Sequence, residues 1–312
     1  MRILATGSAG MLGSALVPAL VRAGHRVLAT DINLTDPQPW GPTGPELGHL
    51  DVRDRDQVRH VMAATQPDIV LHLAAETSLE LSDADPDHAY LTNTVATKYV
   101  AQQARSAGVP IVYISTAGVF DGQKPTAYTE FDRPNPINTY GASKYEGELL
   151  VASTVPQHFI IRAGWMVGGG RMKDHKFVSR IVDQVRDGAD TIHAVTDKLG
   201  TPTYAPDFST CLLGLLDAKV YGTYHMACGG EGSRFDVAAH LLDVLGRTDI
   251  ELVPVTSDYF ADEFPSVRPP SEIMRNLVLD LQGMNTMRPW RTALAEYLHV
   301  EFPELVHASR VA

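Results

Sequence analysis

A glycine-rich segment near the amino terminus has the spacing of a phosphate-binding turn. It reads Thr6-Gly7-Ser8-Ala9-Gly10-Met11-Leu12-Gly13 and lies between an apolar run and a helix-like stretch. Glycines at these positions permit a tight turn and let a pyrophosphate approach the free N–H groups at the start of a helix. Ser8 departs from the usual G-x-G-x-x-G pattern, so G-x-x-G-x-x-G describes the motif better. The segment predicts a dinucleotide site, and a glycine-rich turn without a ligand is the alternative.

An acidic residue follows the second apolar run. Asp31 comes directly after Val27–Thr30, where a carboxylate can accept hydrogen bonds from the adenosine ribose of a dinucleotide. Its charge would repel the 2′-phosphate of NADP, so Asp31 favours NAD(H). Arg53 and Arg55 are nearby cations in the sequence and keep NADP(H) as the alternative cofactor. The alternative is that Asp31 is a solvated turn residue without a ligand.

A tyrosine and a lysine four residues apart provide a candidate proton-transfer pair. Tyr140 and Lys144 lie in Tyr140-Gly141-Ala142-Ser143-Lys144, and residues at this spacing share one face of a helix. A nearby ammonium favours the ionised form of a tyrosine, whose pKa is ordinarily near ~10. Thr116 follows another apolar run and could donate a hydrogen bond to a carbonyl oxygen. The pattern predicts acid/base catalysis by Tyr140, although a surface helix pair is the commoner meaning of this spacing alone.

The first half of the chain alternates apolar runs with helix-like stretches, which is typical of parallel strands joined by crossover helices. The runs are rich in Val, Ile and Leu without strict alternation, so both faces of the sheet should be buried in a doubly wound α/β fold. The expected strands are Ile3–Thr6, Val27–Thr30, Leu47–Asp51, Ile69–Leu73, Ile111–Ser115 and Phe159–Arg162. The expected helices are Met11–Ala23, Arg55–Thr65, Asp87–Ala107 and Tyr140–Val155. The proline-rich segment Thr35–Pro45 predicts a loop.

Regularity weakens after Gly164, and Gly168-Gly169-Gly170 suggests a junction. We expect a dinucleotide-binding domain over residues 1–164 and a mainly substrate-binding region over residues 165–312, with about 203–226 returning to the main sheet. Within this second half, the expected helices are His175–Asp187, Pro206–Asp217 and Phe235–Leu245, and the expected strands are Ile192–Val195 and Thr223–Met226.

Taken in order, these motifs resemble those of the extended short-chain dehydrogenases/reductases. The match comprises the glycine motif, Asp31, His72-Leu73-Ala74-Ala75, Asn93, Ser115-Thr116 and Tyr140-x-x-x-Lys144. The resemblance implies a Rossmann fold that binds a nicotinamide dinucleotide. It assigns Tyr140 as the proton donor or acceptor, Lys144 to the ribose and to lowering the tyrosine pKa, and Thr116 to the substrate oxygen. The cofactor contacts that it implies are Gly7, Gly10, Met11, Leu12, Gly13, Asp31, Ile32, Asp51, Val52, Leu73, Ala74, Ala75 and Lys144.

A narrower resemblance reaches the second half of the chain. The segments Ser115–Gly122, Arg162-Ala163-Gly164-Trp165, Gly200–Asp207 and Arg268-Pro269-Pro270 are similar to those of dTDP-4-dehydrorhamnose reductases, which reduce the C4 ketone of a nucleotide-linked 6-deoxy sugar. The substrate contacts implied by this resemblance are Thr77, Thr116, Phe120, Tyr140, Trp165 and Arg268. Ordinary core packing of Trp165 and a solvated loop position for Arg268 are the alternatives.

Two departures from the reductase pattern fall beside the expected substrate site. Ala117-Gly118 stands where those reductases usually have Asp-Tyr, and Glu76 stands where they usually have an aromatic residue. These changes leave room for another nucleotide sugar. The same Ala117-Gly118 pair argues against a 4,6-dehydratase, which needs an acidic pair after the threonine.

The sequence therefore predicts NAD(P)H-dependent reduction of a nucleotide-linked 4-keto-6-deoxy sugar. One alternative is a nucleotide sugar epimerase, which would use the same Tyr140 and Lys144. The other is a non-catalytic regulatory subunit, because the chain also resembles the dinucleotide-binding β subunit of methionine adenosyltransferase.

The amino-acid composition limits the classes of molecule that this protein is expected to bind. A net charge of −11 over 312 residues leaves no basic field for nucleic acid or an anionic membrane. Two cysteines, Cys211 and Cys228, cannot form a disulfide framework, which fits a reducing cytoplasm, and no leader or membrane span is visible. The histidines show no metal-ligand spacing, so no metal site is expected. A small-molecule nucleotide sugar is the expected partner, and the resemblance leaves room for a homodimer.

Overall fold

The computed structural model describes residues 1–34, 44–170 and 172–308. Most of the loop predicted over Thr35–Pro45 lies outside these residues.

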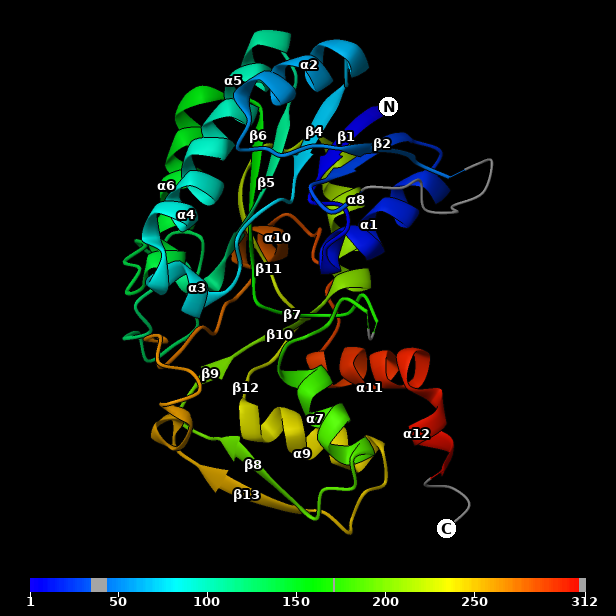
Figure 1. The fold of residues 1–312 in the computed structure, drawn as a ribbon, viewed down its shortest axis with the longest axis vertical. Helices are drawn as coiled ribbons and strands as arrows, with labels where there is room; N and C mark the ends of the chain where they lie inside the picture. Colours follow the sequence, from blue (N-terminus) through cyan, green and yellow to red (C-terminus); the bar gives the residue numbers. More distant parts are fainter. Residues whose placement is uncertain (35–43, 171, 309–312) are drawn as a thin grey trace.

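A sheet of seven parallel strands forms the centre of the larger part of the molecule (Figure 1). Its order is β11-β6-β5-β4-β1-β2-β3, so the strand order reverses between β1 and β4. The strands are β1 (Arg2–Thr6), β2 (Arg26–Asp31), β3 (Glu46–His49), β4 (Ile69–His72), β5 (Ile111–Thr116), β6 (His158–Ala163) and β11 (Gly222–Met226). All four residues of β4 are buried, as their apolar run predicts for a strand covered on both faces.

Helices cover both faces of this sheet (Figure 1). On one face lie α2 (Arg55–Thr65), α5 (Ala96–Ala107) and α6 (Thr139–Thr154), and on the other lie α1 (Met11–Arg22) and α8 (Ala205–Ala218). Each face has its own apolar core, one formed with α1 and α8 and the other with α2, α5 and α6. The predicted doubly wound α/β fold is confirmed.

The helix predicted over Asp87–Ala107 is present as one helical stretch with a π-helical turn inside it. It consists of α4 (Pro86–Tyr90), the π-helical turn η1 (Leu91–Val95) and α5, and it is preceded by a short helix α3 (Leu79–Ala84). The π turn carries Asn93, which is fully buried and hydrogen-bonds outside its own helix. A single wide turn of this kind often marks a functional site, and it cannot be seen in the apolar periodicity.

The smaller region consists of three two-stranded pairs and their helices. The pairs are β7 (Trp165–Val167) with β10 (Pro202–Tyr204), β8 (Thr191–Val195) with β13 (Glu251–Val255), and β9 (Leu199–Gly200) with β12 (Gly232–Ser233). The helices are α7 (Phe177–Arg186), α9 (Arg234–Val244), α11 (Trp290–Glu301) and α12 (Pro303–Ala308), with the 3₁₀ turn η3 (Ser257–Phe260). In the larger part, the 3₁₀ turn η2 (Ala117–Val119) follows β5, and α10 (Leu277–Leu281) packs on β11. Within residues 203–226, α8 packs on α1 and β11 pairs with β6. A domain boundary near residue 164, between the dinucleotide-binding domain and the substrate-binding region, stays a prediction.

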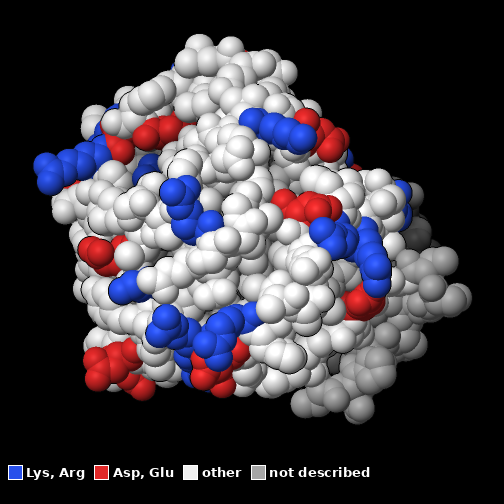
Figure 2. Space-filling view, turned by 90° about the horizontal axis from the view of Figure 1, so that it is seen from above, with Lys and Arg blue, Asp and Glu red and all other residues white. Residues whose placement is uncertain are grey.

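Charge is mixed on the face of the molecule seen in Figure 2. Lys and Arg side chains lie among Asp and Glu side chains there, without a continuous basic area. Among the described residues, no helix has the length and apolar character needed to cross a membrane.

A buried ion pair joins α6 to the sheet. Arg162 on β6 donates from Nε to Glu148 Oε1 at 2.9 Å and from Nη2 to Oε2 at 2.7 Å, and both side chains are 5% exposed. Two parallel bonds in this geometry hold the helix that carries Tyr140 and Lys144 in a fixed position against β6. Removing one partner would leave an uncompensated buried charge.

We predict that Arg162→Met lowers the free energy of unfolding by about 3–5 kcal/mol, because Glu148 would remain charged and buried. The double variant Arg162→Met with Glu148→Leu should be less destabilised than either single variant. Arg180→Met is the matched control, since its pair with Glu263 is exposed and should be worth about 0–1 kcal/mol. Urea unfolding followed by circular dichroism measures the wild type, the two single variants of the buried pair, the double variant and Arg180→Met, and a loss at Arg162 no larger than at Arg180 would contradict the expectation.

Candidate active site

A cavity of about 910 Å³ opens at the carboxyl ends of the strands, between the large sheet and the smaller region. This is the place where open α/β sheets bind ligands, at the point where the strand order reverses. All but one of the residues predicted from the sequence line it. They are Gly7, Gly10, Met11, Leu12, Gly13, Asp31, Ile32, Asp51, Val52, Leu73, Ala74, Ala75, Thr77, Thr116, Tyr140, Lys144, Trp165 and Arg268.

The glycine turn fits a dinucleotide pyrophosphate. Gly7 has a φ of +67°, and a Cβ there would lie 2.4 Å from the backbone nitrogen of Ala74. Helix α1 has Gly10 at its N-cap with no side-chain hydrogen bond. Within the described part of the chain, the N–H groups of Met11, Leu12 and Gly13 donate no hydrogen bond, because the first helical bond is from Ser14 N to Gly10 O. These free donors are the groups that would hold phosphate oxygens.

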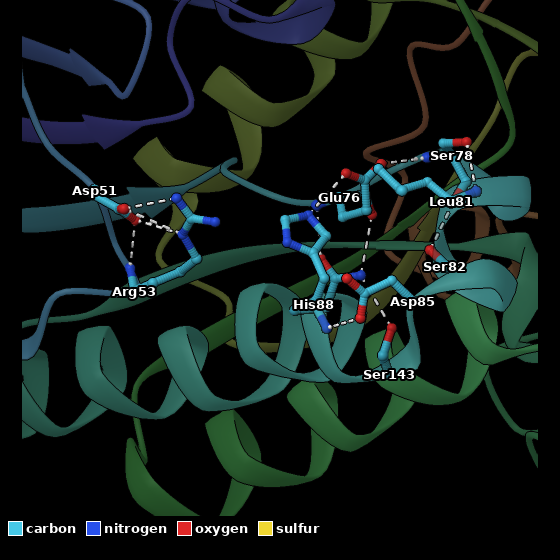
Figure 3. Close-up of polar contacts among 10 residues, drawn as sticks. Asp51, Arg53, Glu76, Ser78, Leu81, Ser82, Asp85, His88 and Ser143 are labelled. Carbon is cyan, nitrogen blue, oxygen red and sulfur yellow. Dashed lines mark hydrogen bonds and ion pairs between the residues drawn. The ribbon is translucent and has the colours of Figure 1, made fainter.

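The adenosine end of the cavity carries two carboxylates and one arginine. Asp31 Oδ2 accepts from Ala9 N at 3.1 Å and Oδ1 accepts from Asn33 N at 2.9 Å, so the turn itself orients the carboxylate. Asp51 binds the Arg53 guanidinium at 2.8 Å, as Figure 3 shows, and this bond holds the pKa of Asp51 below its usual value. Arg53 also lines the cavity, so this end holds a cation beside the two carboxylates.

Tyr140 and Thr116 face the cavity together from α6 and the end of β5. Burial raises the pKa of Tyr140 to about 12, the nearby Thr116 hydroxyl acts in the opposite direction, and the carboxylates of Glu272 and Glu76 add to the rise. Tyr140 is therefore a protonated phenol at neutral pH.

Lys144 lies one helical turn beyond Tyr140, and its side chain is 2% exposed. Its Nζ sits 4.2 Å from the ring centroid of Tyr113, a cation–π contact, and burial lowers its pKa to about 7, against the attraction of Glu148. Lowering of the tyrosine pKa by Lys144 stays a prediction. Burial is the largest cause of the raised pKa of Tyr140, and the Lys144 side chain lies against Tyr113.

Local contacts fix the start of α6. Asn138 caps the helix by accepting from Gly141 N at 2.8 Å. A Cβ at Gly141 would lie 2.2 Å from the carbonyl oxygen of Gly118, so only glycine permits this approach of α6 to η2. Tyr113 donates its hydroxyl proton to the backbone oxygen of Lys144 at 3.1 Å. The helix thus packs with its reactive face toward the cavity.

Glu76 is tied to the surrounding loops rather than free in the cavity. Its Oε1 accepts from Ser78 N at 2.8 Å and its Oε2 lies 3.2 Å from His88 Nε2 (Figure 3). Its backbone N–H donates to Asn93 Oδ1 at 2.9 Å. The carboxylate that departs from the reductase pattern is therefore a structural anchor between the β4 loop and α4.

The opposite end of the cavity is built around Trp165. Its indole Nε1 donates to Glu272 Oε2 at 2.7 Å, and the Arg234 guanidinium lies 3.6 Å from the centroid of its ring system. Arg268 forms an ion pair with Glu80 on α3. The sequence reasoning found Trp165 and Arg268 but missed Arg234, Glu272 and Glu80. No motif marks these three, although Glu272 lies only two residues after Arg268-Pro269-Pro270.

Phe120 is a correction to the predicted substrate contacts. It is fully buried and stacks on Tyr128 with ring centroids 4.2 Å apart, away from the cavity lining. Its neighbour Thr116 ends a strand and points to the cavity, whereas Phe120 follows the η2 turn and its ring enters a separate apolar cluster. Phe120 is therefore a core residue.

Residues 1–34, 44–170 and 172–308 contain no group of three or more His, Cys, Asp or Glu side chains placed to hold a metal ion.

Comparison with known proteins identifies the family. A family model described as the RmlD substrate binding domain matches residues 1–301. The chain is 30% identical over 297 residues to the dTDP-4-dehydrorhamnose reductase of Mycolicibacterium smegmatis, covering 95% of this chain and 84% of that protein. A dTDP-4-dehydrorhamnose reductase structure from Clostridium acetobutylicum has a TM-score of 0.86 at 32% identity, covering 96% of this chain and 99% of the other. One from Bacillus anthracis, in complex with NADP, has a TM-score of 0.84 at 30% identity, covering 95% and 98%. The chain belongs to the RmlD substrate binding domain family of the extended short-chain dehydrogenases/reductases.

Proposed function

We propose that this protein uses NAD(P)H to reduce the C4 ketone of a nucleotide-linked 4-keto-6-deoxy sugar. The observation that carries the proposal is that Thr116 and Tyr140 face the same cavity as the glycine turn at one end and Trp165 at the other. One cavity can therefore hold a dinucleotide and a sugar with the reacting carbon between them. Relatives named dTDP-4-dehydrorhamnose reductase support the substrate class.

Each catalytic side chain has one task in this proposal. When bound, the reduced nicotinamide supplies the hydride to the ketone carbon. Tyr140 donates its phenolic proton to the ketone oxygen, and Thr116 donates a hydrogen bond that stabilises charge on that oxygen. Lys144 holds the ribose hydroxyls through its ammonium. The raised pKa of Tyr140 suits this direction, because the phenol already carries the proton that reduction consumes.

The adenosine end supports NADH as the favoured cofactor. The Asp31 carboxylate is held in place by two backbone donors and would repel a 2′-phosphate. Arg53 is committed to Asp51 by a bidentate pair, which reduces its availability to that phosphate. NADPH remains the alternative, and the Bacillus anthracis relative was crystallised with NADP.

We also propose a cytoplasmic location and a homodimer. Both cysteines, Cys211 and Cys228, are free and buried, which supports a reducing compartment. The dimer rests on the family resemblance alone.

The first test is oxidation of NADH and, separately, of NADPH by the purified protein, with and without a dTDP-4-keto-6-deoxy sugar. We expect substrate-dependent loss of absorbance at the nicotinamide band, faster with NADH. Dinucleotide binding without oxidation would contradict the reductase. Cofactor retained through purification with no net oxidation would then indicate the epimerase, and a stable complex with a larger enzyme would indicate the regulatory subunit.

The second prediction concerns Tyr140→Phe, which removes one hydroxyl and keeps the ring. Turnover should fall roughly 10²- to 10⁴-fold because no proton reaches the ketone oxygen, while the Kd for NADH stays within about twofold. Tyr145→Phe is the matched control, because Tyr145 lies on the same helix but does not line the cavity. Steady-state kinetics and fluorescence titration measure both effects, and wild-type turnover in Tyr140→Phe would remove Tyr140 from the mechanism.

The third prediction concerns pH. Burial lowers the pKa of Lys144 to about 7, so its ammonium is present below pH 7 and is lost as the pH rises. Because the ribose contact needs the charged form, we expect the affinity for NADH to fall above pH 7, by up to about tenfold per pH unit. Lys144→Met should bind NADH weakly with little pH dependence. Titrations between pH 6 and 9 test this, and identical pH profiles for the two proteins would contradict the role of Lys144.

A further inference from the structure

Glu272 presents an unoccupied carboxylate oxygen beside the proposed reacting centre. Its Oε2 accepts from Trp165 Nε1 at 2.7 Å, whereas no group among the described residues donates a hydrogen bond to Oε1. The residue lines the cavity, so this oxygen can be reached by a ligand. Glu76, the other carboxylate near Tyr140, differs because both of its oxygens already have partners.

Gly118 provides the space in which this oxygen lies. A Cβ at position 118 would sit 3.6 Å from Glu272 Oε1 and 3.4 Å from Thr116 Oγ1. The free oxygen and the Thr116 hydroxyl therefore flank the same small volume. A long side chain at position 118 would fill this volume and push the Glu272 carboxylate aside. The glycine that replaces the usual tyrosine of the reductase pattern therefore makes room for this carboxylate.

The carboxylate is held in position through Trp165. Trp165 fixes Oε2, and the Arg234 guanidinium covers the indole at 3.6 Å and also lies 5.2 Å from the Phe177 ring. These contacts restrain the Trp165 ring and, through it, the orientation of Glu272. A restrained acceptor loses little side-chain entropy when it binds a ligand, so its hydrogen bond discriminates well between ligands.

We propose that Glu272 is a specificity-determining residue that accepts a hydrogen bond from the hydroxyl on the sugar carbon next to the ketone, C3. The proposal rests on the proposed function, in which Thr116 and Tyr140 hold the C4 oxygen. Of the two ring carbons that flank C4 in a 6-deoxy sugar, C5 carries a methyl group, which cannot donate, and C3 carries a hydroxyl, which can. The substrate class is thereby narrowed to 4-keto-6-deoxy sugars with a free 3-hydroxyl.

The test compares a dTDP-4-keto-6-deoxy sugar with its 3-deoxy analogue at saturating NADH. We expect the wild-type protein to prefer the 3-hydroxy substrate by roughly 10- to 100-fold in kcat/KM, the effect of a hydrogen bond to a charged group. Glu272→Ala should remove this preference by lowering kcat/KM on the 3-hydroxy sugar roughly 10- to 100-fold more than on the 3-deoxy analogue, because the loss of its charge near Tyr140 acts equally on both substrates. Glu272→Gln should keep part of it, since an amide oxygen still accepts. An equal loss on both substrates would overturn the proposal.

Gly118→Leu tests the same oxygen from the opposite side, should the Glu272 variants fail to fold. It should reproduce the loss of preference, because the new side chain would displace the carboxylate. Glu263→Gln is the control for the change of charge, since that carboxylate is exposed on the surface and pairs with Arg180. The Kd for NADH should be unchanged in every variant.

Binding separates failure of this proposal from failure of the proposed function. If the wild-type protein reduces neither sugar, the reductase is wrong, and the Kd values of a dTDP-6-deoxyhexose and of dTDP alone still decide the role of Glu272. Glu272→Ala should then weaken binding of the dTDP-sugar roughly tenfold and leave that of dTDP unchanged. Equal affinities of wild type and variant for the dTDP-sugar would overturn the assignment.

Discussion

The structure depends on one close backbone approach, that of Gly7 to Ala74. With any other residue at position 7, a Cβ would overlap the Ala74 backbone nitrogen at 2.4 Å, and the φ of +67° would be strained as well. This contact lets the turns after β1 and β4 meet at the point where the strand order reverses. A hydrogen bond of 2.8 Å between Thr6 Oγ1 and His72 Nδ1 joins the ends of β1 and β4 just before these turns. Burial lowers the pKa of His72 to about 3, so this support is a neutral hydrogen bond that does not change near neutral pH.

The position of the reactive helix follows from that approach. The chain leaving Ala74 reaches Glu76, whose backbone N–H and C=O both bond the side chain of Asn93 in the π turn. Asn93 Nδ2 also donates to Ser143 Oγ at 3.0 Å, and Ser143 lies on α6 between Tyr140 and Lys144. Close packing, the chain from Ala74 to Glu76 and these hydrogen bonds thus connect the glycine turn to the helix that carries Tyr140. The distance between the nicotinamide site and Tyr140 is fixed by short-range bonds, which is what transfer over a few ångströms requires.

The sequence predicts those features that depend on neighbouring residues. Strands such as Ile69–His72 begin with an apolar run, and the glycine turn and Tyr140-x-x-x-Lys144 place their groups by local geometry, so both could be expected from the printed chain. Features that depend on packing between distant segments could not. Phe120 follows the Ser115-Thr116 motif by only a few residues, yet its ring enters a cluster with Tyr128. Arg234 and Glu272 meet Trp165 from segments far away in the chain, and no local pattern records such a meeting.

The electrostatics around Tyr140 favour one direction of proton transfer. With a pKa raised to about 12, the phenol keeps its proton at pH 7, so the group is a poor base but is ready to donate. An alkoxide forming on the ketone oxygen is more basic than this phenolate, so the proton still passes to it. Once the phenolate has formed, burial and the carboxylates of Glu76 and Glu272 disfavour it, which drives its reprotonation. Glu272, which binds the sugar hydroxyl in our proposal, therefore also favours the return of Tyr140 to its protonated form. Burial makes the Tyr140 phenol a weaker acid, but it also ensures that the phenol is protonated before the next reduction.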